Sequence, residues 1–172
     1  MGLPMIYVDD RERKPLHHLD GTYCTYRTAR LSVGDYALES MCTETPGRKT
    51  LTPRFSIERK SISDWLSSWH GKVRRGKRWT DNRAREIAKI LKAQRLGFNL
   101  MYVLDGNEKD IEKAVQREPW KRKGLTARQV MYYIAYLRAQ GIHVITSPTR
   151  LHAEIAILNL LNAARKKETG GK

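Results

Sequence analysis

The segment 56–65 constrains the fold more than any other part of the chain, because a strand pattern passes into a helix pattern within it. Side chains alternate between the two faces of a strand, so Glu58 and Lys60 are predicted on one face and Arg59 on the other. Ser61 or Ser63 can cap the helix that follows. The segment therefore places an acid beside a base at the point where a strand meets a helix.

A second acid, Asp35, follows Gly34 within a predicted strand over 31–38. If this strand pairs with the strand that carries Glu58, the two carboxylates can share a divalent cation, since Mg²⁺ and Mn²⁺ prefer oxygen ligands. Lys60 would then orient the water that attacks a phosphodiester, or help to deprotonate it. Glu-x-Lys by itself more often belongs to a surface salt-bridge cluster, and that alternative stays open on these residues alone.

The net charge of +15 on 172 residues indicates a polyanionic partner, and nucleic acid is the commonest one. A membrane surface is the alternative, but it would require a basic amphipathic segment that has no role in the core. Hydrophobic residues make up 40% of the chain, which predicts one folded domain over residues 1–166 and a flexible basic tail at 167–172. The sequence lacks both a signal-peptide pattern and an apolar run near the ~20 residues that span a bilayer, so we expect a soluble, intracellular, DNA-associated protein.

Strand patterns come first along the chain and then alternate with helix patterns, which predicts an α/β fold around one mixed sheet. The polar segment 43–53 is predicted to be a hairpin tip, and 71–78 a basic loop that contains two glycines. Strands are expected at 5–8, 22–29, 31–38, 54–58, 99–104 and 142–145, and helices at 15–19, 61–69, 80–96, 110–117, 126–140 and around 155–161.

Basic residues are dense over 72–95, where ten lysines and arginines stand against two acids. Such density beside a metal site would hold the phosphate backbone of DNA during cleavage. For the lysines of the predicted helix a solvated surface is the simpler interpretation, while apolar residues within 87–96 would form one buried stripe. Trp79 could stack on a base, and residues 121–123 are a second candidate contact. The predicted DNA-binding side chains of the loop are Lys72, Arg74, Arg75, Lys77 and Arg78.

Three motif blocks occur in order in the first half of the chain: V-D-D-R-E at 8–12, L-S-V-G-D-Y at 31–36 and I-E-R-K-S-I-S-D at 57–64. Together they resemble the nuclease domain of XPF-type structure-specific endonucleases, a family that includes the eukaryotic XPF and Mus nucleases and archaeal Hef. The family motif is V-D-x-R-E, then G-D, a variable gap and E-R-K-x-x-x-D, so all three blocks match. The resemblance implies a PD-(D/E)xK-like fold, that is, a restriction-endonuclease-like α/β fold of three layers in which helices flank a mixed central sheet.

The resemblance also implies an endonuclease that depends on Mg²⁺ or Mn²⁺. Matched residue by residue, the metal ligands would be Asp35 and Glu58, with Asp9 as an additional acid, and Lys60 would be catalytic. The other matched residues would complete the site: Glu12 in the same cleft, Arg11 and Arg59 as braces of the carboxylates or contacts to phosphate, and Asp64 on the first turn of the helix.

Two departures from the family pattern bear on the substrate. The segment 71–75 looks inserted before residues 76–79, which stand where the family has a Gly-Arg element, with Asn82 in the place of a glutamine. We also expect neither the helix-hairpin-helix motifs nor the helicase region of well-studied members.

The expected activity is cleavage of branched or flapped DNA, in repair or recombination. A non-catalytic DNA-binding subunit and a Holliday-junction resolvase or nicking enzyme are the alternatives. Because nuclease domains of the resembling family commonly pair, we expect a homodimer or heterodimer. Three tyrosines of one predicted helix would belong either to the core or to that interface: Tyr132, Tyr133 and Tyr136.

Overall fold

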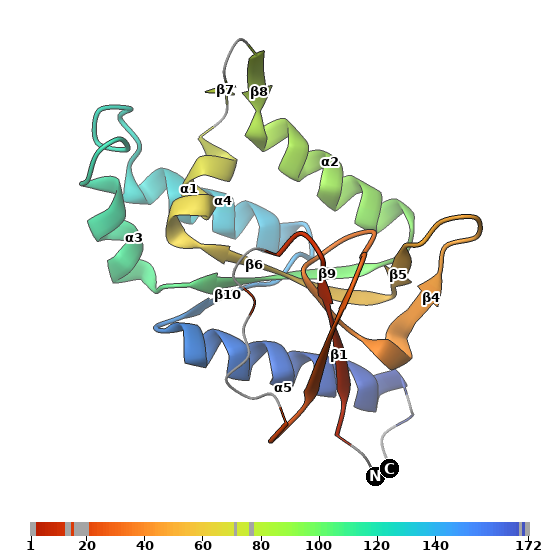
Figure 1. Cartoon of the computed structure of the whole chain (residues 1–172). Coiled ribbons are helices and arrows are strands. Elements are labelled where there is room, and N and C mark those ends of the chain that lie inside the picture. The colour runs from red at the N-terminus through yellow and green to blue at the C-terminus, as the bar shows by residue number, and fades with distance from the viewer. Residues whose placement is uncertain are drawn as a thin grey trace.

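A mixed sheet forms the centre of the protein, which we describe from a computed structural model covering residues 3–12, 15, 21–70, 72–75, 78–168 and 170, with the backbone alone at 72–75, 78–80 and 168. Its strands are β1 (Met5–Asp9), β2 (Thr25–Ala29), β3 (Tyr36–Leu38), β6 (Phe55–Ser61), β9 (Asn99–Asp105) and β10 (Val144–Ser147). They lie side by side in the order β10-β9-β6-β3-β1-β2 (Figure 1).

Strand directions differ between the two halves of this sheet. β6, β9 and β10 run parallel to one another, and β6 pairs with β9 along its whole length, from Phe55 to Ser61. β3 lies antiparallel between β6 and β1, while β2 runs parallel to β1. The mixed sheet confirms the predicted α/β class, although the strand predicted at 31–38 is confined to β3 and the one predicted at 54–58 continues to Ser61.

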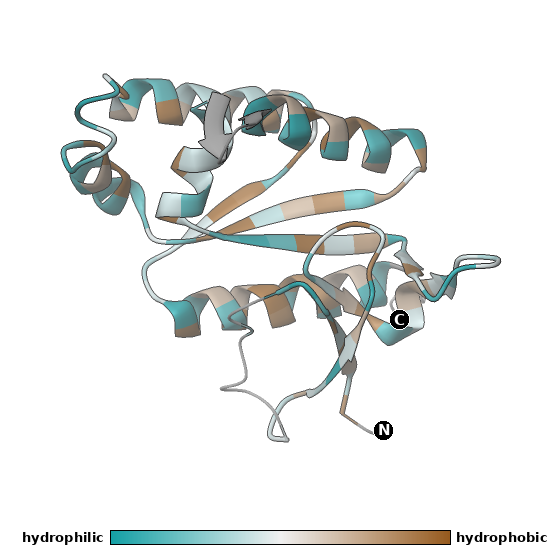
Figure 2. Cartoon of the chain, turned by 45° about the horizontal axis from the view of Figure 1, so that its top comes forward, coloured by the Kyte–Doolittle hydropathy of each residue, from teal (hydrophilic) through white to brown (hydrophobic). Residues whose placement is uncertain are grey.

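Helices cover both faces of the sheet and give three layers (Figures 1 and 2). Side chains along β9 point alternately to the two faces, so this strand contributes to the core on both sides of the sheet. Tyr102 and Leu104 pack with helices on one face, and Val103 packs with the C-terminal helix on the other. The first face is covered by α1 (Ile62–Trp69), α2 (Asn82–Arg95), α3 (Glu108–Val115) and α4 (Ala127–Ala139), and the second by α5 (Arg150–Glu168).

Two short hairpins stand outside the central sheet. The first, β4 (Cys42–Glu44) with β5 (Leu51–Pro53), follows a 3₁₀ turn at Glu39–Met41 and confirms the predicted hairpin. The second corrects the prediction of a basic loop at 71–78, because β7 (Lys72–Arg75) pairs antiparallel with β8 (Arg78–Asp81). Cross-strand hydrogen bonding supplies partners for backbone groups that an irregular loop would leave to solvent.

The apolar stripe predicted for α2 is wrong in part, because Leu91 and Leu96 are 53% and 49% exposed. The side of the helix turned to the protein instead carries Asn82, Glu86, Ile90 and Ala93, all buried. Two of these four are polar, so a pattern based on hydrophobicity does not identify the buried face. The same buried polar residues become important at the candidate site.

Four other predictions concern a short helix near the N-terminus, the C-terminal tail, the tyrosines of α4 and membrane-spanning helices. The helix predicted at 15–19 lies outside the described residues apart from Pro15. α5 continues to Glu168, into the segment predicted as a flexible tail. Of the three tyrosines predicted for either the core or an interface, Tyr133 stacks on Trp69 with ring centroids 5.3 Å apart, whereas Tyr132 and Tyr136 are 66% and 43% exposed. Each helix that the structure describes is too short or too polar to cross a membrane.

Candidate active site

The junction between β3 and β6 brings Asp35 to Glu58, as the sequence predicts. The backbone N–H of Asp35 donates to the carbonyl oxygen of Ile57 (2.8 Å), and the N–H of Arg59 donates to Asp35 Oδ2 (2.8 Å). Gly34 makes this approach possible: a Cβ built there would lie 2.7 Å from Ser56 Cβ, and its φ of +77° is one that residues with side chains rarely adopt. A glycine at position 34 is therefore required by the packing of the two strands.

The electrostatic state of Asp35 fits a site for a cation. Burial raises the pKa of this carboxyl well above its usual range, and the negative charge of Glu58 raises it further. Glu12 adds to the effect, whereas the N–H of Arg59 and the charge of Lys89 act in the opposite direction. A divalent cation bound between Asp35 and Glu58 would remove this repulsion, and their oxygens are ligands that Mg²⁺ and Mn²⁺ accept.

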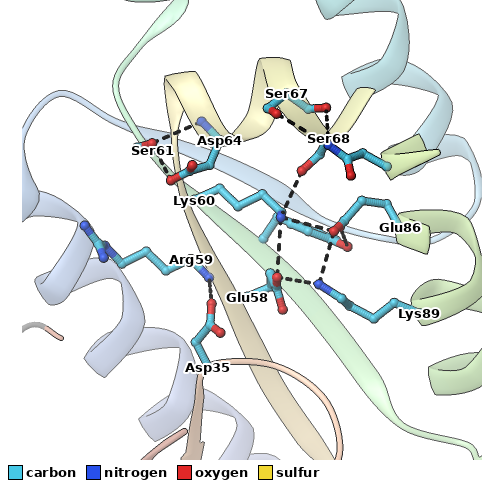
Figure 3. A network of polar contacts seen from close by, with 12 residues as sticks. Asp35, Glu58, Arg59, Lys60, Ser61, Asp64, Ser67, Ser68, Glu86 and Lys89 are labelled. Atoms are coloured by element: carbon cyan, nitrogen blue, oxygen red, sulfur yellow. Dashed lines mark hydrogen bonds and ion pairs between the residues drawn. The ribbon is translucent and has the colours of Figure 1, made fainter. Parts of the chain in front are cut away.

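Lys60 lies beside Glu58 on the same face of β6, with its Nζ 3.5 Å from Glu58 Oε1 (Figure 3). It also donates to Ser68 Oγ in α1 (3.1 Å) and to Glu86 Oε1 in α2 (3.1 Å). The predicted side-by-side placement of acid and base is thus present. The lysine is held in a fixed position by two helices that follow its strand.

Two charged residues of α2 complete this network, and sequence reasoning missed both as site residues. Lys89 Nζ donates to Glu58 Oε1 (2.5 Å) and to Glu86 Oε1 (3.2 Å), while Glu86 Oε2 accepts from the hydroxyl of Tyr102 (3.0 Å). Burial opposes ionisation of Glu86, yet Lys60 and Lys89 hold its pKa below the usual value. The sequence does carry one sign of these site residues, because Asn82, Glu86 and Lys89 are spaced so that they lie on one side of a helix.

A polar pocket of about 330 Å³ opens over this network. Its wall comes from the end of β6, from α1 and from the first turns of α2. Asn82 Nδ2 donates to the carbonyl oxygen of Ser67 (3.2 Å) and ties the start of α2 to α1. The lining residues are Lys60, Asp64, Ser67, Ser68, Asn82, Arg85, Glu86 and Lys89.

Asp64 is placed where it was predicted, on the first turn of α1, but its described contacts are to the helix start. Ser61 Oγ donates to Asp64 Oδ2 (2.7 Å), and the N–H of Asp64 donates back to Ser61 Oγ (3.1 Å). This arrangement caps α1 directly after Lys60. Asp64 therefore fixes the strand-to-helix junction and lines the pocket.

Arg59 points away from Lys60, to the other side of β6 (Figure 3). It pairs with Asp105 at the end of β9, through two hydrogen bonds, and with Glu12, whose Oε1 lies 3.6 Å from Arg59 Nη1. Its side chain is only 7% exposed. Arg59 thus braces two acids with its guanidinium, and it holds Asp35 through its backbone N–H.

Asp9 is buried, but its carboxylate is bound to other residues. The backbone N–H and the guanidinium of Arg11 donate to it at 2.6–2.9 Å, and the N–H of Leu31 donates to Oδ2 at 2.8 Å. Burial raises its pKa, yet these hydrogen bonds outweigh it, so the pKa lies below the usual value. The backbone N–H of Asp9 donates to the carbonyl oxygen of Asp35 (2.8 Å), but the described contacts of the Asp9 carboxylate are to Arg11 and Leu31 and not to Glu58. About half of the Arg11 side chain is exposed.

Within the described residues, no cluster of three or more acids, histidines or cysteines is arranged to hold a metal ion. Asp35 and Glu58, whose carboxylates repel each other, could hold a divalent cation together. The predicted DNA contacts Lys72, Arg74, Arg75 and Arg78 lie on β7 and β8, for which only the backbone is described, and Lys77 lies outside the described residues. The hairpin connects α1 to α2 (Figure 1). Both of these helices line the pocket.

Comparison with known proteins identifies a matching family and a similar solved structure. A model of the ERCC4 domain matches residues 8–158. The solved structure of XPF from Aeropyrum pernix is similar, with a TM-score of 0.63 at 17% sequence identity; the match covers 94% of this chain and 61% of that one. No curated protein sequence matches. The structural match confirms the restriction-endonuclease-like fold, and the two matches together confirm the resemblance drawn from the three motif blocks.

Proposed function

This chain belongs to the ERCC4 domain family, a family of nucleases, and on that premise we propose that it is a Mg²⁺- or Mn²⁺-dependent DNA endonuclease. The observation that carries the proposal is the meeting of Asp35, Glu58 and Lys60 at the junction of β3 with β6. A structural salt bridge would not need two carboxylates that repel each other. Here the pKa of Asp35 is raised by burial and by Glu58, which favours a site built to receive a cation.

Each residue then has a distinct part in the hydrolysis. Asp35 and Glu58 would hold the metal ion, which when bound supplies positive charge to the phosphate. Lys60 is fixed by Ser68 and Glu86, so that its ammonium can orient the attacking water or stabilise charge that develops on a phosphate oxygen. The N–H of Arg59 keeps the Asp35 carboxylate in place.

We propose branched or flapped DNA as the substrate and the β7–β8 hairpin as a main contact. The hairpin adjoins the pocket, and its segment belongs to the most basic part of the chain. Lysine and arginine contacts to phosphate position DNA without reading its sequence, which suits an enzyme that recognises DNA shape. Roles in DNA repair or recombination, and pairing with a second nuclease domain, stay predictions.

A panel of labelled substrates tests the activity: flap, fork, four-way junction and linear duplex, each with Mg²⁺, with Mn²⁺ or with EDTA. Cleavage is expected only with metal, and preferentially on the flap or fork. D35N, E58Q and K60M should each lower the rate by at least about 100-fold, on the scale of removing one charge-stabilising group. E112Q, which changes an exposed acid of α3, is the matched control and should cleave like the wild type.

The proposal fails if no substrate is cut, or if D35N and E58Q cut as fast as the wild type. Cleavage of the four-way junction alone would identify a resolvase. Metal-independent binding of all substrates without cleavage would identify a non-catalytic DNA-binding subunit.

A further inference from the structure

Four charged groups alternate in sign in one cluster, and the candidate metal ligand Glu58 is one of them (Figure 3). Glu58 Oε1 lies 2.5 Å from Lys89 Nζ and 3.5 Å from Lys60 Nζ. Glu86 Oε1 lies 3.2 Å from Lys89 Nζ and 3.1 Å from Lys60 Nζ. The two ammonium groups are therefore shared between the same two carboxylate oxygens.

This arrangement means that Glu58 Oε1 is already occupied by positive charge. A divalent cation at the same oxygen would meet two ammonium groups at contact distance, and like charges this close repel strongly. At least one ammonium has to leave Glu58 for the cation to bind. The cation and the two lysine ammonium groups therefore compete for the same position at Glu58 Oε1.

The contacts indicate which lysine leaves. Lys60 is anchored by Ser68 Oγ as well as by Glu86, and its distance to Glu58 is the longer of the two. Lys89 makes the shortest contact to Glu58, so it occupies the space that a metal ion needs. Its side chain is 29% exposed, against 11% for Lys60, which leaves it more room to move.

We propose that Lys89 is the resident counter-ion of Glu58 and competes with the divalent cation, and that Glu86 is the acid that receives Lys89 when the cation binds. This inference rests on the proposed function. Glu86 suits the part because it is buried and fixed by the hydroxyl of Tyr102, itself fully buried. Its Oε1 already contacts Lys89, so the exchange needs only a small rotation at the end of the lysine side chain. Both are positioning residues that set the metal affinity.

The two residues should then have opposite effects on metal binding. K89Q removes the competitor and should bind Mn²⁺ about tenfold more tightly than the wild type, which corresponds to about 1.4 kcal/mol. E86Q leaves both lysines with Glu58 as their remaining carboxylate and should bind Mn²⁺ about tenfold more weakly. A purely structural role would weaken binding in both variants.

Calorimetric titration of Mn²⁺ into the full chain without DNA measures these affinities, with circular dichroism to establish that each variant is folded. K92Q removes the same charge three residues further along α2, where Lys92 contacts the carbonyl oxygen of Ser32 (3.2 Å), and should leave the affinity unchanged. Titrations at low and high KCl separate two effects of K89Q: the loss of the direct contact between Lys89 and Glu58, and the general loss of one positive charge. Salt screens distant charges more than a buried pair, so the direct effect is less sensitive to KCl. The K89Q effect should persist at high salt.

The outcomes separate this inference from the proposed function. If the wild type binds no Mn²⁺, or if D35N binds it equally well, the metal site itself is refuted. If the wild type binds and D35N does not, but K89Q binds no more tightly than the wild type, only the exchange of Lys89 is refuted. An effect of K92Q equal to that of K89Q would also overturn the exchange. Should E86Q fail to fold, K89Q decides alone.

Discussion

Replacing Gly34 by alanine tests why a glycine precedes the metal-site acid. The new Cβ would lie 2.7 Å from both Cβ and Oγ of Ser56 and 3.3 Å from the carbonyl oxygen of Ile57. Real Cβ atoms do not approach other atoms this closely, so β3 and β6 would have to separate. The separation would disturb the hydrogen bond from the N–H of Asp35 to the carbonyl oxygen of Ile57. The Asp35 carboxylate would then move as well.

The loss of unfolding free energy in G34A has two parts, and each can be measured separately. A positive φ costs an L-residue about 1–2 kcal/mol, partly offset by the lower entropy of the unfolded chain that has alanine in place of glycine. Overpacking of a buried contact adds about 1–3 kcal/mol. Gly47 has a similar φ of +71° but nothing within 4 Å of its added Cβ, so G47A isolates the first part. We expect about 1 kcal/mol for G47A and about 3 kcal/mol for G34A.

Thermal unfolding resolves this difference. For a domain of this size 1 kcal/mol lowers the Tm by about 2–4 °C, so G47A should lose about 2–4 °C and G34A about 6–12 °C. An S56G background removes the two atoms at 2.7 Å and leaves the carbonyl oxygen of Ile57 at 3.3 Å, so the cost of G34A should fall close to that of G47A. Equal losses for G34A and G47A in the wild-type background would refute the claim that close approach of the strands selects this glycine.

Three further predictions concern the charged groups. D35N should stabilise the metal-free protein, because burial and the charge of Glu58 raise the pKa of Asp35. The wild type should therefore lose stability relative to the variant as the pH rises above about 4. Thermal unfolding measured across a range of pH checks this. R59M should cost about 3–5 kcal/mol in urea unfolding because it removes the guanidinium from both Asp105 and Glu12, and R59M with D105N should recover the part of the loss that is due to Asp105. Substituting Lys72, Arg74 and Arg75 together by alanine should lower the slope of log affinity against log salt by about 0.9 for each lost phosphate contact, measured by fluorescence anisotropy on duplex DNA, whereas no change of slope would exclude the hairpin as a phosphate contact.

Periodicity predicted the parts of the fold in which burial follows hydrophobicity. Alternation in 56–60 placed Glu58 and Lys60 on one face and Arg59 on the other, and the structure has them so. Capping residues also predicted where helices begin, since Thr126 caps α4 as expected and Ser61, one of the two predicted serines, caps α1. These signals are local, and local signals survive folding because the backbone geometry alone sets which side a residue takes.

The missed features are those in which polar residues are buried in pairs. In α2, Leu91 is exposed while Glu86 is 7% exposed, the reverse of what hydrophobicity indicates. Burial of Glu86 is tolerated because Lys60, Lys89 and Tyr102 supply its hydrogen bonds, and those partners come from three different elements. A contact between β6, β9 and α2 exists only after folding, so a single sequence does not show it.

Asp9 and Asp35 illustrate the same limit within the motif itself. Both are acids at strand ends, yet the pKa of Asp9 lies below the usual value and that of Asp35 well above it. The difference lies in the hydrogen-bond donors: Asp9 receives the guanidinium of Arg11 and two backbone N–H groups, whereas the N–H of Arg59 has to act against burial and Glu58 at Asp35. An acid that already has an arginine gains little from a metal ion, and an acid in a repulsive pair gains much. D9N should therefore lower the Tm while leaving the affinity for Mn²⁺ nearly unchanged, and D35N should raise the Tm while abolishing that affinity; a loss of Mn²⁺ binding in folded D9N would instead return Asp9 to the metal site.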